Sequence, residues 1–368
     1  MMLTMFRRLR RPRDRIVSNL QEIKNALSRL SARATVKVVV LSPQKIQFCE
    51  QEIRAASIDG VEFTILLDIA EALQSGATFD VAILCCHVQG EEEAALFKLR
   101  QHGLARLYGV WFWDNHHHHN FNLRVATLAD VVFVSHWHEN QYLNLPTALA
   151  GAHIPAYSNQ WSAGAIARHY PAGLPAERQD ALFGGFGRYA WAVERNRFVE
   201  AVSAACPGHH LTLGKIDAYF SISAAERLRA WVEHKVQLVV PINRDVSTRV
   251  FEALMTGQIP LLPDDVPDLD LVIDKQIQAV LPILRYKAGD VESAIASWRQ
   301  GVALFDRDGA AGVQRRHEFA RDRHSLAARL GDFACFLRHP GPFKLVSNGQ
   351  HQFWDRWQNA PPSKERIP

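Results

Sequence analysis

The sequence predicts an α/β protein built from two doubly wound, mainly parallel sheets, and three observations carry this prediction. The chain has 368 residues, a length that suits two domains of ordinary size. Hydrophobic residues make up 48% and charged residues 22%, the profile of a soluble globular protein. Short apolar, β-branched runs alternate with helical segments in both halves of the chain, as expected where crossover helices join parallel strands.

The first series of elements follows a basic N-terminal segment. "VKVVVLS" at 36–42 is typical of a buried parallel strand, and further apolar runs follow it. We expect helices at 44–57, 90–104 and 137–145, the second of which has acids in its first turn, as the helix dipole favours. The expected strands are residues 36–42, 61–68, 80–87, 107–115 and 130–136. Together these elements form a predicted N-terminal domain over residues 36–160.

A weakly patterned stretch separates this series from a second one. Residues 151–180 are rich in Ala, Gly and Pro, and we interpret 161–180 as a linker. The C-terminal domain is expected over residues 181–337. Its expected strands are 181–188, 209–215, 236–243, 259–264 and 279–283, and its expected helices are 193–206, 224–234, 247–257, 290–305 and 311–337. Two domains of one architecture place a cleft between them.

The positive charge of the chain is concentrated at its N-terminus. Residues 1–33 carry nine Lys/Arg and two Asp/Glu, whereas the remainder carries 33 and 36. We expect a basic leader helix over residues 1–35. It either lies on an anionic membrane surface or packs its few apolar residues on the body of the protein. No basic stripe with interleaved aromatic residues continues into the body, so we expect no nucleic-acid partner.

Composition also predicts the compartment. No apolar run approaches the roughly 18 residues of a membrane span, and no apolar region of a secretory signal follows the N-terminal arginines. The five cysteines are odd in number and form no CxxC pair, which favours a reducing compartment. Cys85 and Cys86 lie in an expected buried strand and suit core packing. We expect a cytoplasmic protein, with peripheral contact at the inner face of the membrane as the alternative that the leader leaves open.

The strongest functional signal is "NRDVSTRVFEALMTGQIPLLPDD" at 243–265. Ser247 or Thr248 can cap the start of a helix, and Gly257 stands where its end favours a left-handed residue. Glu252 then lies near the carboxyl edge of the sheet, where open α/β sheets bind ligands. A carboxylate there can accept hydrogen bonds from ribose hydroxyls, and Arg249 suits a diphosphate. The alternative is a solvated Glu252 with Arg249 as its surface partner.

"STRVFEALMTGQIPLL" resembles the donor-site helix of glycosyltransferases of the GT-B fold, the glycosyltransferase group 1 family, and within them the spore-protein CgeB-like group. "DALFGGFGRYAWAVERNRFVEAV" at 180–202 resembles the start of the C-terminal domain of that group. The resemblance covers about residues 180–335. It implies two Rossmann-like domains facing a central cleft, and a C-terminal extension over 338–368 that packs back on the first domain. It also implies sugar transfer from a nucleotide-diphosphate sugar to a glycan, lipid-linked glycan or protein acceptor.

The resemblance implies particular residues for the donor site. Glu252 would hold the ribose, while Ser247, Thr248 and Arg249 would meet the diphosphate. Arg188 would neutralise phosphate charge, and three glycines would allow close approach of the backbone. With the loop before the helix, the implied donor-binding residues are Gly184, Gly185, Gly187, Arg188, Asn243, Arg244, Ser247, Thr248, Arg249 and Glu252.

One position departs from the pattern of this family. Many retaining GT-B enzymes carry two glutamates spaced E-x7-E, whereas the first of these positions is Arg244 here and Asp245 is one residue away. The choice between retention and inversion therefore stays open. No cofactor and no metal ion is implied, and "DLD" at 268–270 reads as part of a surface loop.

Four consecutive histidines follow Asp114 at the end of an expected strand. Histidine titrates near neutral pH, and a nearby carboxylate can orient it, so Asp114 with His116 or His117 is the candidate base for the acceptor hydroxyl. A metal site would need further ligands, such as His136 and His138, because adjacent residues in an extended loop point in opposite directions. A polar rim without chemistry is the third interpretation.

Two other histidine pairs have structural interpretations. His209 and His210 open an expected strand, and His317 and His324 lie seven apart on a helix, as on a solvated or cleft-rim face. Three rival functions remain: a nucleotide-sugar epimerase, a non-catalytic protein that binds nucleotide sugars, and a metalloprotein with a histidine site.

Overall fold

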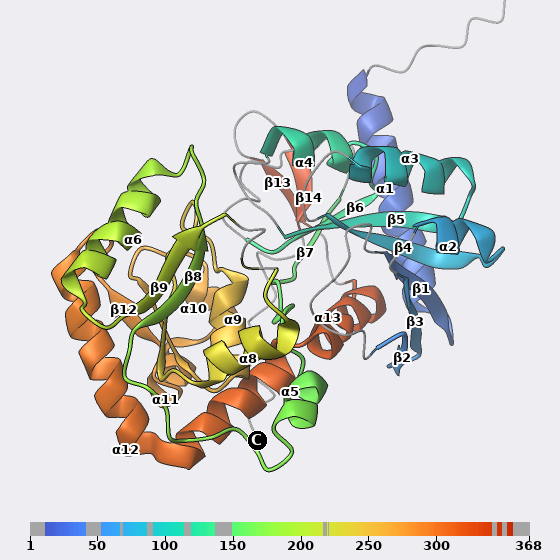
Figure 1. Cartoon of the computed structure of the whole chain (residues 1–368). Coiled ribbons are helices and arrows are strands. Elements are labelled where there is room, and N and C mark those ends of the chain that lie inside the picture. Colours follow the sequence, from blue (N-terminus) through green and yellow to red (C-terminus); the bar gives the residue numbers. More distant parts are fainter. Residues whose placement is uncertain are drawn as a thin grey trace, which may run out of the picture. The chain divides into compact units, whose positions relative to one another are not determined.

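The computed structural model describes residues 12–41, 53–66, 69–86, 91–113, 119–136, 149–215, 219, 221–340, 344–347 and 352–355. Within them the chain divides into two compact units, each with its own sheet (Figure 1). Among the described residues, unit 1 contains those up to 41, residues 55–154 and those from 332 onward, and unit 2 contains residues 53–54 and 155–331. Both sheets are mainly parallel and carry helices, which confirms the predicted α/β class. The cleft between the units stays a prediction.

Unit 1 is built on a nine-stranded sheet with the order β13-β14-β7-β6-β5-β4-β1-β3-β2. Its strands are β1 (Val36–Leu41), β2 (Ala55–Ile58), β3 (Val61–Leu66), β4 (Phe79–Cys86), β5 (Ala105–Phe112), β6 (Val131–Val134), β7 (Leu149–His153), β13 (Lys344–Ser347) and β14 (Gln352–Asp355). Neighbouring strands from β14 to β3 are parallel, whereas β2 and β13 pair antiparallel at the two edges. The predicted strands of this half are therefore confirmed within the described residues, and Cys85 and Cys86 are buried in β4.

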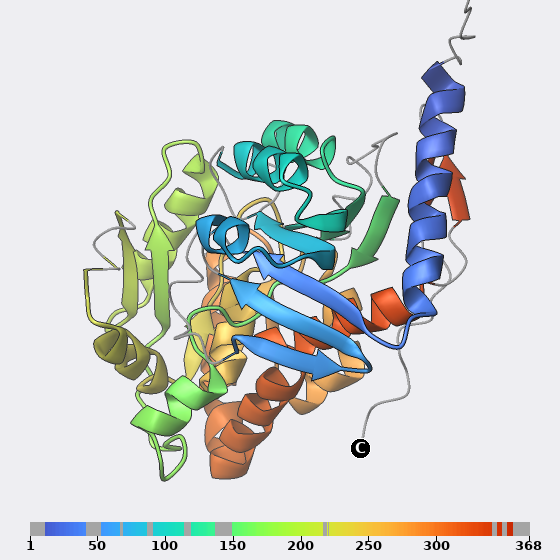
Figure 2. The ribbon, with the colours of Figure 1, turned by 90° about the vertical axis from the view of Figure 1, so that its right-hand side faces the viewer.

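Helix α1 (Pro12–Ser31) is the long helix coloured blue in Figure 2. Leu20, Ile23, Leu27 and Leu30 recur at intervals of three and four residues and are all buried. The helix packs beside β7 of unit 1. Its apolar residues therefore pack on the body of the protein, which is the second of the two interpretations of the leader. None of the helices within the described residues is long and apolar enough to cross a bilayer.

The remaining helices of unit 1 are α2 (Ile69–Gln74), α3 (Glu91–Gln101), α4 (His119–Ala126) and the carboxyl part of α13 (Leu326–Arg338). Phe333 of α13 packs edge-on against Trp111 and Phe133, with ring centroids 5.2 and 4.9 Å apart. Arg338 donates hydrogen bonds to the carbonyls of Arg33, Ala34 and Asp59. These contacts tie the end of α13 into the aromatic core of unit 1, and residues 338–368 contribute β13 and β14 to the same sheet.

Unit 2 is built on a five-stranded sheet, β12-β11-β10-β8-β9, in which every described pairing is parallel. The strands are β8 (Phe183–Gly187), β9 (His210–Gly214), β10 (Val236–Leu238), β11 (Ile259–Pro263) and β12 (Leu284–Tyr286). The helices are α5 (Ala163–His169), α6 (Val193–Ala205), α8 (Ala224–Val232), α9 (Thr248–Met255), α10 (Leu269–Val272), α11 (Lys275–Val280) and α12 (Val291–Arg323). The chain runs from β8 to β9 on one side and then to β10 on the other. The strand order thus reverses beside β8, the position at which open α/β sheets bind ligands.

The structure corrects three sequence-based boundaries. Residues 55–57, expected to end a helix, belong to β2, because Asp59 and Gly60 both adopt positive φ and form a tight turn into β3. The prediction of a strand at 279–283 is wrong. Helix α11, which Asp274 caps, extends to Val280, and β12 begins only at Leu284. The expected linker contains α5, which Ser162 caps. The expected helix at 137–145 lies outside the described residues.

Candidate functional site

A cavity of about 210 Å³ lies at the carboxyl edge of the sheet of unit 2. It is lined by Gln160, Gly185, Phe186, Gly187, Thr212, Gly214, Lys215, Tyr219, Ile222, Trp231 and Arg249. Gly187 and Gly214 are the last residues of β8 and β9. The cavity therefore lies at the carboxyl ends of β8 and β9, next to the place where the strand order reverses, as expected of a ligand site in this fold class.

Helix α9 supplies one wall of the cavity, and its ends follow the sequence. Ser247 is the N-cap, and its hydroxyl accepts a hydrogen bond from the backbone N–H of Arg249 at 3.4 Å. Gly257, just beyond the C-cap, has φ +78°, and a Cβ there would lie 2.7 Å from Val313 Cγ1. Both termini are thus fixed, so Arg249 is held at the cavity in the first turn of the helix.

The cavity carries positive charge. Arg249 Nε donates a hydrogen bond to the carbonyl of Gly185 at 3.1 Å, while its terminal amino groups make no hydrogen bond to the described residues. Lys215 follows β9 directly, and none of the described residues that line the cavity is acidic. Two cations with no carboxylate among the described lining residues favour an anionic ligand, and Phe186, Tyr219 and Trp231 offer aromatic surface beside them.

Glu252 belongs to α9 but does not line the cavity. Its side chain is 0% exposed, and it is absent from the lining of the cavity. Burial raises the pKa of Glu252 to about 7. Arg249, the side-chain and backbone amides of Gln160, and the Thr248 hydroxyl lower this pKa, but by less than burial raises it. The carboxyl group therefore holds its proton to a higher pH than a solvated glutamate does. The predicted alternative of a solvated Glu252 is wrong.

A chain of hydrogen bonds joins Glu252 to the cavity. Gln160 Nε2 donates to Glu252 Oε2 at 3.0 Å, and the Tyr219 hydroxyl donates to Gln160 Oε1 at 2.9 Å. Trp231 Nε1 donates in turn to the Tyr219 hydroxyl at 3.0 Å. Burial raises the pKa of Tyr219 to about 12, so the phenol keeps its proton. Gln160, Tyr219 and Trp231 line the cavity, and Glu252 ends the chain behind them.

The structure brings only some of the sequence-predicted donor residues to the cavity. Gly185, Gly187 and Arg249 line it. The predicted residues that do not line it are Gly184, Arg188, Asn243, Arg244, Ser247, Thr248 and Glu252. A Cβ on Gly184 would lie 2.8 Å from the Phe186 ring, so its lack of a side chain serves packing. The roles of all these residues toward a ligand stay predictions.

Two of the predicted arginines have other partners. The guanidinium of Arg188 forms an ion pair with Glu200, and both side chains are half exposed. Arg244 Nε donates to the Asp265 carbonyl at 2.7 Å and lies 3.1 Å from its carboxylate. Asn243 and Arg244 both have positive φ, at 52° and 65°. A sharp turn thus directs Arg244 to Asp265. Arg244 is the residue that stands at the first position of the E-x7-E pattern.

The predicted catalytic residues Asp114, His116 and His117 lie outside the described residues, as does His138. His136 is described and buried, with Nε2 3.2 Å from the carbonyl of Trp113. Trp111 and Trp113 are also buried, so neither offers an open face to a sugar. Across the described part of the chain, no three His, Cys, Asp or Glu side chains converge as metal ligands.

The structure corrects two further expectations. His324 is 3% exposed rather than solvated, and its ring stacks on Phe251 with centroids 4.5 Å apart. Burial and the neighbouring Arg329 hold the pKa of His324 well below its usual value, so the ring is neutral. The "DLD" segment is not a simple loop, since α10 begins at Leu269. Asp270 there pairs with Lys275 at 3.2 Å and with Arg285.

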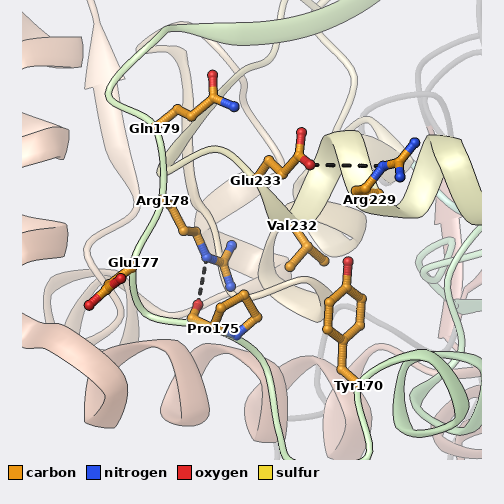
Figure 3. Close-up of a pocket in the computed structure, with 8 residues that line it drawn as sticks. All are labelled: Tyr170, Pro175, Glu177, Arg178, Gln179, Arg229, Val232 and Glu233. Atoms are coloured by element: carbon orange, nitrogen blue, oxygen red, sulfur yellow. Dashed lines mark hydrogen bonds and ion pairs between the residues drawn. The ribbon is translucent and has the colours of Figure 1, made fainter.

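A second cavity, of about 520 Å³, lies at the opposite edge of the same sheet, near the amino ends of β8 and β10 (Figure 3). Its lining mixes two arginines with two glutamates. Arg229 lies 3.8 Å from Glu233, and Arg178 Nε donates to the Pro175 carbonyl at 2.9 Å (Figure 3). Arg229 and Glu233 offset each other's charge, and Arg178 also donates through Nη1 to the His234 carbonyl at 3.4 Å. The cavity at the carboxyl edge is therefore the stronger candidate site.

Sequence reasoning missed several residues of the candidate site. Lys215 had a usable signal, because it is the last residue of a predicted strand of the same sheet, at the edge where ligands bind. Gln160, Tyr219 and Trp231 had none, since they come from a segment predicted to be irregular and from separate elements that only the fold assembles.

No protein-family model and no curated protein matches the chain. Solved structures similar to it include the apo structure of OtsA, with 9% sequence identity and a TM-score of 0.48, covering 83% of this chain and 100% of that one. Another is a mutant of the Thermobaculum terrenum O-GlcNAc transferase, with 14% identity, a TM-score of 0.46 and coverage of 90% and 75%. A third is the sucrose-phosphate synthase of Thermosynechococcus elongatus, with 12% identity, a TM-score of 0.45 and coverage of 88% and 93%. The α/β class of this chain rests on its own two sheets.

Proposed function

We propose that unit 2 binds a nucleotide-diphosphate sugar and that the chain is a glycosyltransferase. The observation that carries the proposal is the cavity at the carboxyl edge of the parallel sheet, which Arg249 and Lys215 make positive and whose described lining residues include no acid. A diphosphate suits this charge, and aromatic surface suits the sugar or base attached to it. The sequence resemblance of the α9 segment to a donor-site helix supports the same ligand class.

Stabilisation of the departing diphosphate is the chemical role we propose for the cavity. Arg249 is anchored through Nε to the Gly185 carbonyl, so its terminal amino groups are pre-positioned for phosphate oxygens. Lys215 adds a second positive charge, and Gly185 and Gly187 let the ligand approach the backbone. These groups can neutralise the charge that develops on the leaving group, so we propose a transfer that needs neither a metal ion nor a cofactor.

The acceptor half of the proposal rests on the sequence. Asp114 with His116 or His117 would take the proton of the acceptor hydroxyl in an inverting enzyme, whereas a retaining enzyme needs no such base. We propose a glycan, a lipid-linked glycan or a protein as the acceptor. The described cysteines, Cys85, Cys86, Cys206 and Cys335, are free thiols, as suits the proposed cytoplasmic location. Peripheral membrane contact would rest on the basic charge of the leader, because its described apolar face is buried.

One observation favours a second candidate, a protein that binds the nucleotide sugar without turnover. Arg244 occupies the position of the first acid of the E-x7-E pattern, and its side chain is held by Asp265. A sugar contact from that acid is therefore lost. Binding of a nucleotide sugar without release of the free nucleotide in the presence of mixed acceptors would support this candidate over the transferase.

The proposal is tested by calorimetric titration of the full chain with UDP, GDP, dTDP and CDP. We expect one of them to bind, and Arg249→Gln to weaken that binding roughly ten-fold or more, because a charge-assisted hydrogen bond is lost. Arg299→Gln, an exposed arginine on α12, is the matched control and should leave the affinity unchanged. If no nucleotide binds, or if both variants bind as well as the natural chain, the assignment of the cavity is wrong.

A further inference from the structure

The hydrogen-bond chain behind the cavity fixes the orientation of one amide group. An indole N–H can only donate, so Trp231 makes the Tyr219 oxygen an acceptor, and the Tyr219 proton is then directed at Gln160 Oε1. At the other end, Glu252 Oε2 accepts from Gln160 Nε2. When Glu252 is ionised it can only accept, so these contacts place the nitrogen of the Gln160 amide on the Glu252 side and its oxygen on the Tyr219 side.

The same amide retains capacity for a ligand. A glutamine amide has two donor hydrogens and two acceptor lone pairs, and the described contacts of the Gln160 side chain use one of each. Gln160 is half-buried and lines the cavity, whereas Glu252 is fully buried and does not. A ligand in the cavity thus meets the amide first, with one donor and one acceptor held side by side.

We propose that Gln160, rather than Glu252, contacts the ribose hydroxyls of the ligand, and that Glu252, Tyr219 and Trp231 are positioning residues that orient it. This inference rests on the proposed nucleotide-binding function. Each ribose hydroxyl can both donate and accept, so a neighbouring pair of hydroxyls matches the donor and acceptor that the amide presents. Glu252 then acts through Gln160.

Charged and titratable groups lie around Glu252 on each side of α9. Arg249, on the same helix, and Tyr219 interact electrostatically with Glu252. On the side facing α12, the His317 ring bonds to the Met255 carbonyl, Arg316 bonds to the Gly257 carbonyl, and His324 stacks on Phe251. None of these α12 groups enters the hydrogen-bond chain. Burial and then Arg249 affect the pKa of Glu252 most, and the hydrogen bond from Gln160 lowers it further.

The experiment compares two variants of the full chain in calorimetric titrations with UDP, GDP, ADP and CDP and their 2′-deoxy counterparts. Gln160→Met keeps the length of the side chain and removes its polar groups, so it should weaken binding about ten-fold and abolish the preference for ribose over deoxyribose. Glu252→Gln should stay within about three-fold of the natural chain, because an amide oxygen still accepts from Gln160. Gln300→Met, an exposed position on α12, is the matched control.

The opposite pattern overturns the inference: loss of affinity in Glu252→Gln with natural affinity in Gln160→Met would make Glu252 the direct contact and leave the nucleotide site intact. Absence of nucleotide binding by the natural chain would overturn the proposed function as well. A second measurement guards against a folding defect. Because Gln160 lowers the pKa of Glu252, the pH at which Glu252 affects stability should rise in Gln160→Met, and an unmoved midpoint would refute the contact.

Discussion

Replacement of Glu252 by glutamine should change how the stability of the protein depends on pH. Glu252 is 0% exposed, and burial raises its pKa from 4.5 to about 7. Between these two values the folded state binds a proton that the unfolded state has released. Stability therefore falls as pH rises, and the contribution is fully lost above the folded pKa. A neutral amide at this position has no proton to lose and should remove this dependence.

The size of the effect follows from the shift. Each pKa unit corresponds to about 1.4 kcal/mol, and part of the transition lies below pH 5. Between pH 5 and pH 8, ionisation of Glu252 should therefore lower the free energy of unfolding of the natural chain by about 2–3 kcal/mol. Histidines with lowered pKa values, such as His234 and His324, change stability in the opposite direction over this range. They are common to both proteins, so the difference between natural chain and variant isolates Glu252.

The assay is urea unfolding at several pH values, followed by tryptophan fluorescence and circular dichroism. The free energy of unfolding of Glu252→Gln, relative to the natural chain, should rise by about 2–3 kcal/mol from pH 5 to pH 8. Glu177→Gln changes an exposed glutamate of the same unit and should run parallel to the natural chain. Parallel curves for Glu252→Gln as well would show that its carboxyl group is not buried as described.

Three further substitutions test the framework around the site by their effect on the free energy of unfolding. Leu27→Ala removes a fully buried side chain from α1 and should cost about 2–5 kcal/mol, whereas Glu22→Ala on the exposed face of that helix should cost little. Gly257→Ala should cost more than Gly173→Ala, because both have positive φ but a Cβ meets a neighbour only at Gly257. Ser247→Ala should cost about 1 kcal/mol through the lost helix cap, and equal stability would refute the cap.

The sequence correctly predicted those helices and strands whose own residues indicate their burial and their ends. Buried parallel strands are continuous apolar runs, so "VKVVVLS" and "DVAILCCH" located β1 and β4 without any knowledge of their neighbours. Helix α9 was equally readable, because Ser247 and Gly257 mark its ends by local backbone chemistry. Residues 55–57 continue a helical pattern, but Asp59 and Gly60 after them favour a hairpin turn. The turn determines the structure there, so residues 55–57 form part of a strand.

The candidate site was only partly predictable for the opposite reason. Glu252 and Arg249 share a helix turn, and both were identified from their position in the predicted α9. Gln160 and Trp231 contribute to the same hydrogen-bond chain from other elements, and nothing in the neighbouring sequence of either residue indicates a ligand. The burial of Glu252 was also hidden, because a glutamate in a helix is usually solvated and only tertiary packing removes it from water.

The return of the chain to unit 1 after residue 331 has a consequence for the order of folding during synthesis. Trp111 and Phe133 leave the ribosome early, but Phe333 and Phe336, which pack on them, emerge only after every residue of unit 2. Unit 2 can therefore complete its core while unit 1 still exposes aromatic surface and the unpaired edge of β7. A nascent chain stalled before residue 332 is the form that we expect chaperones to bind, and the last tenth of the chain ends that exposure.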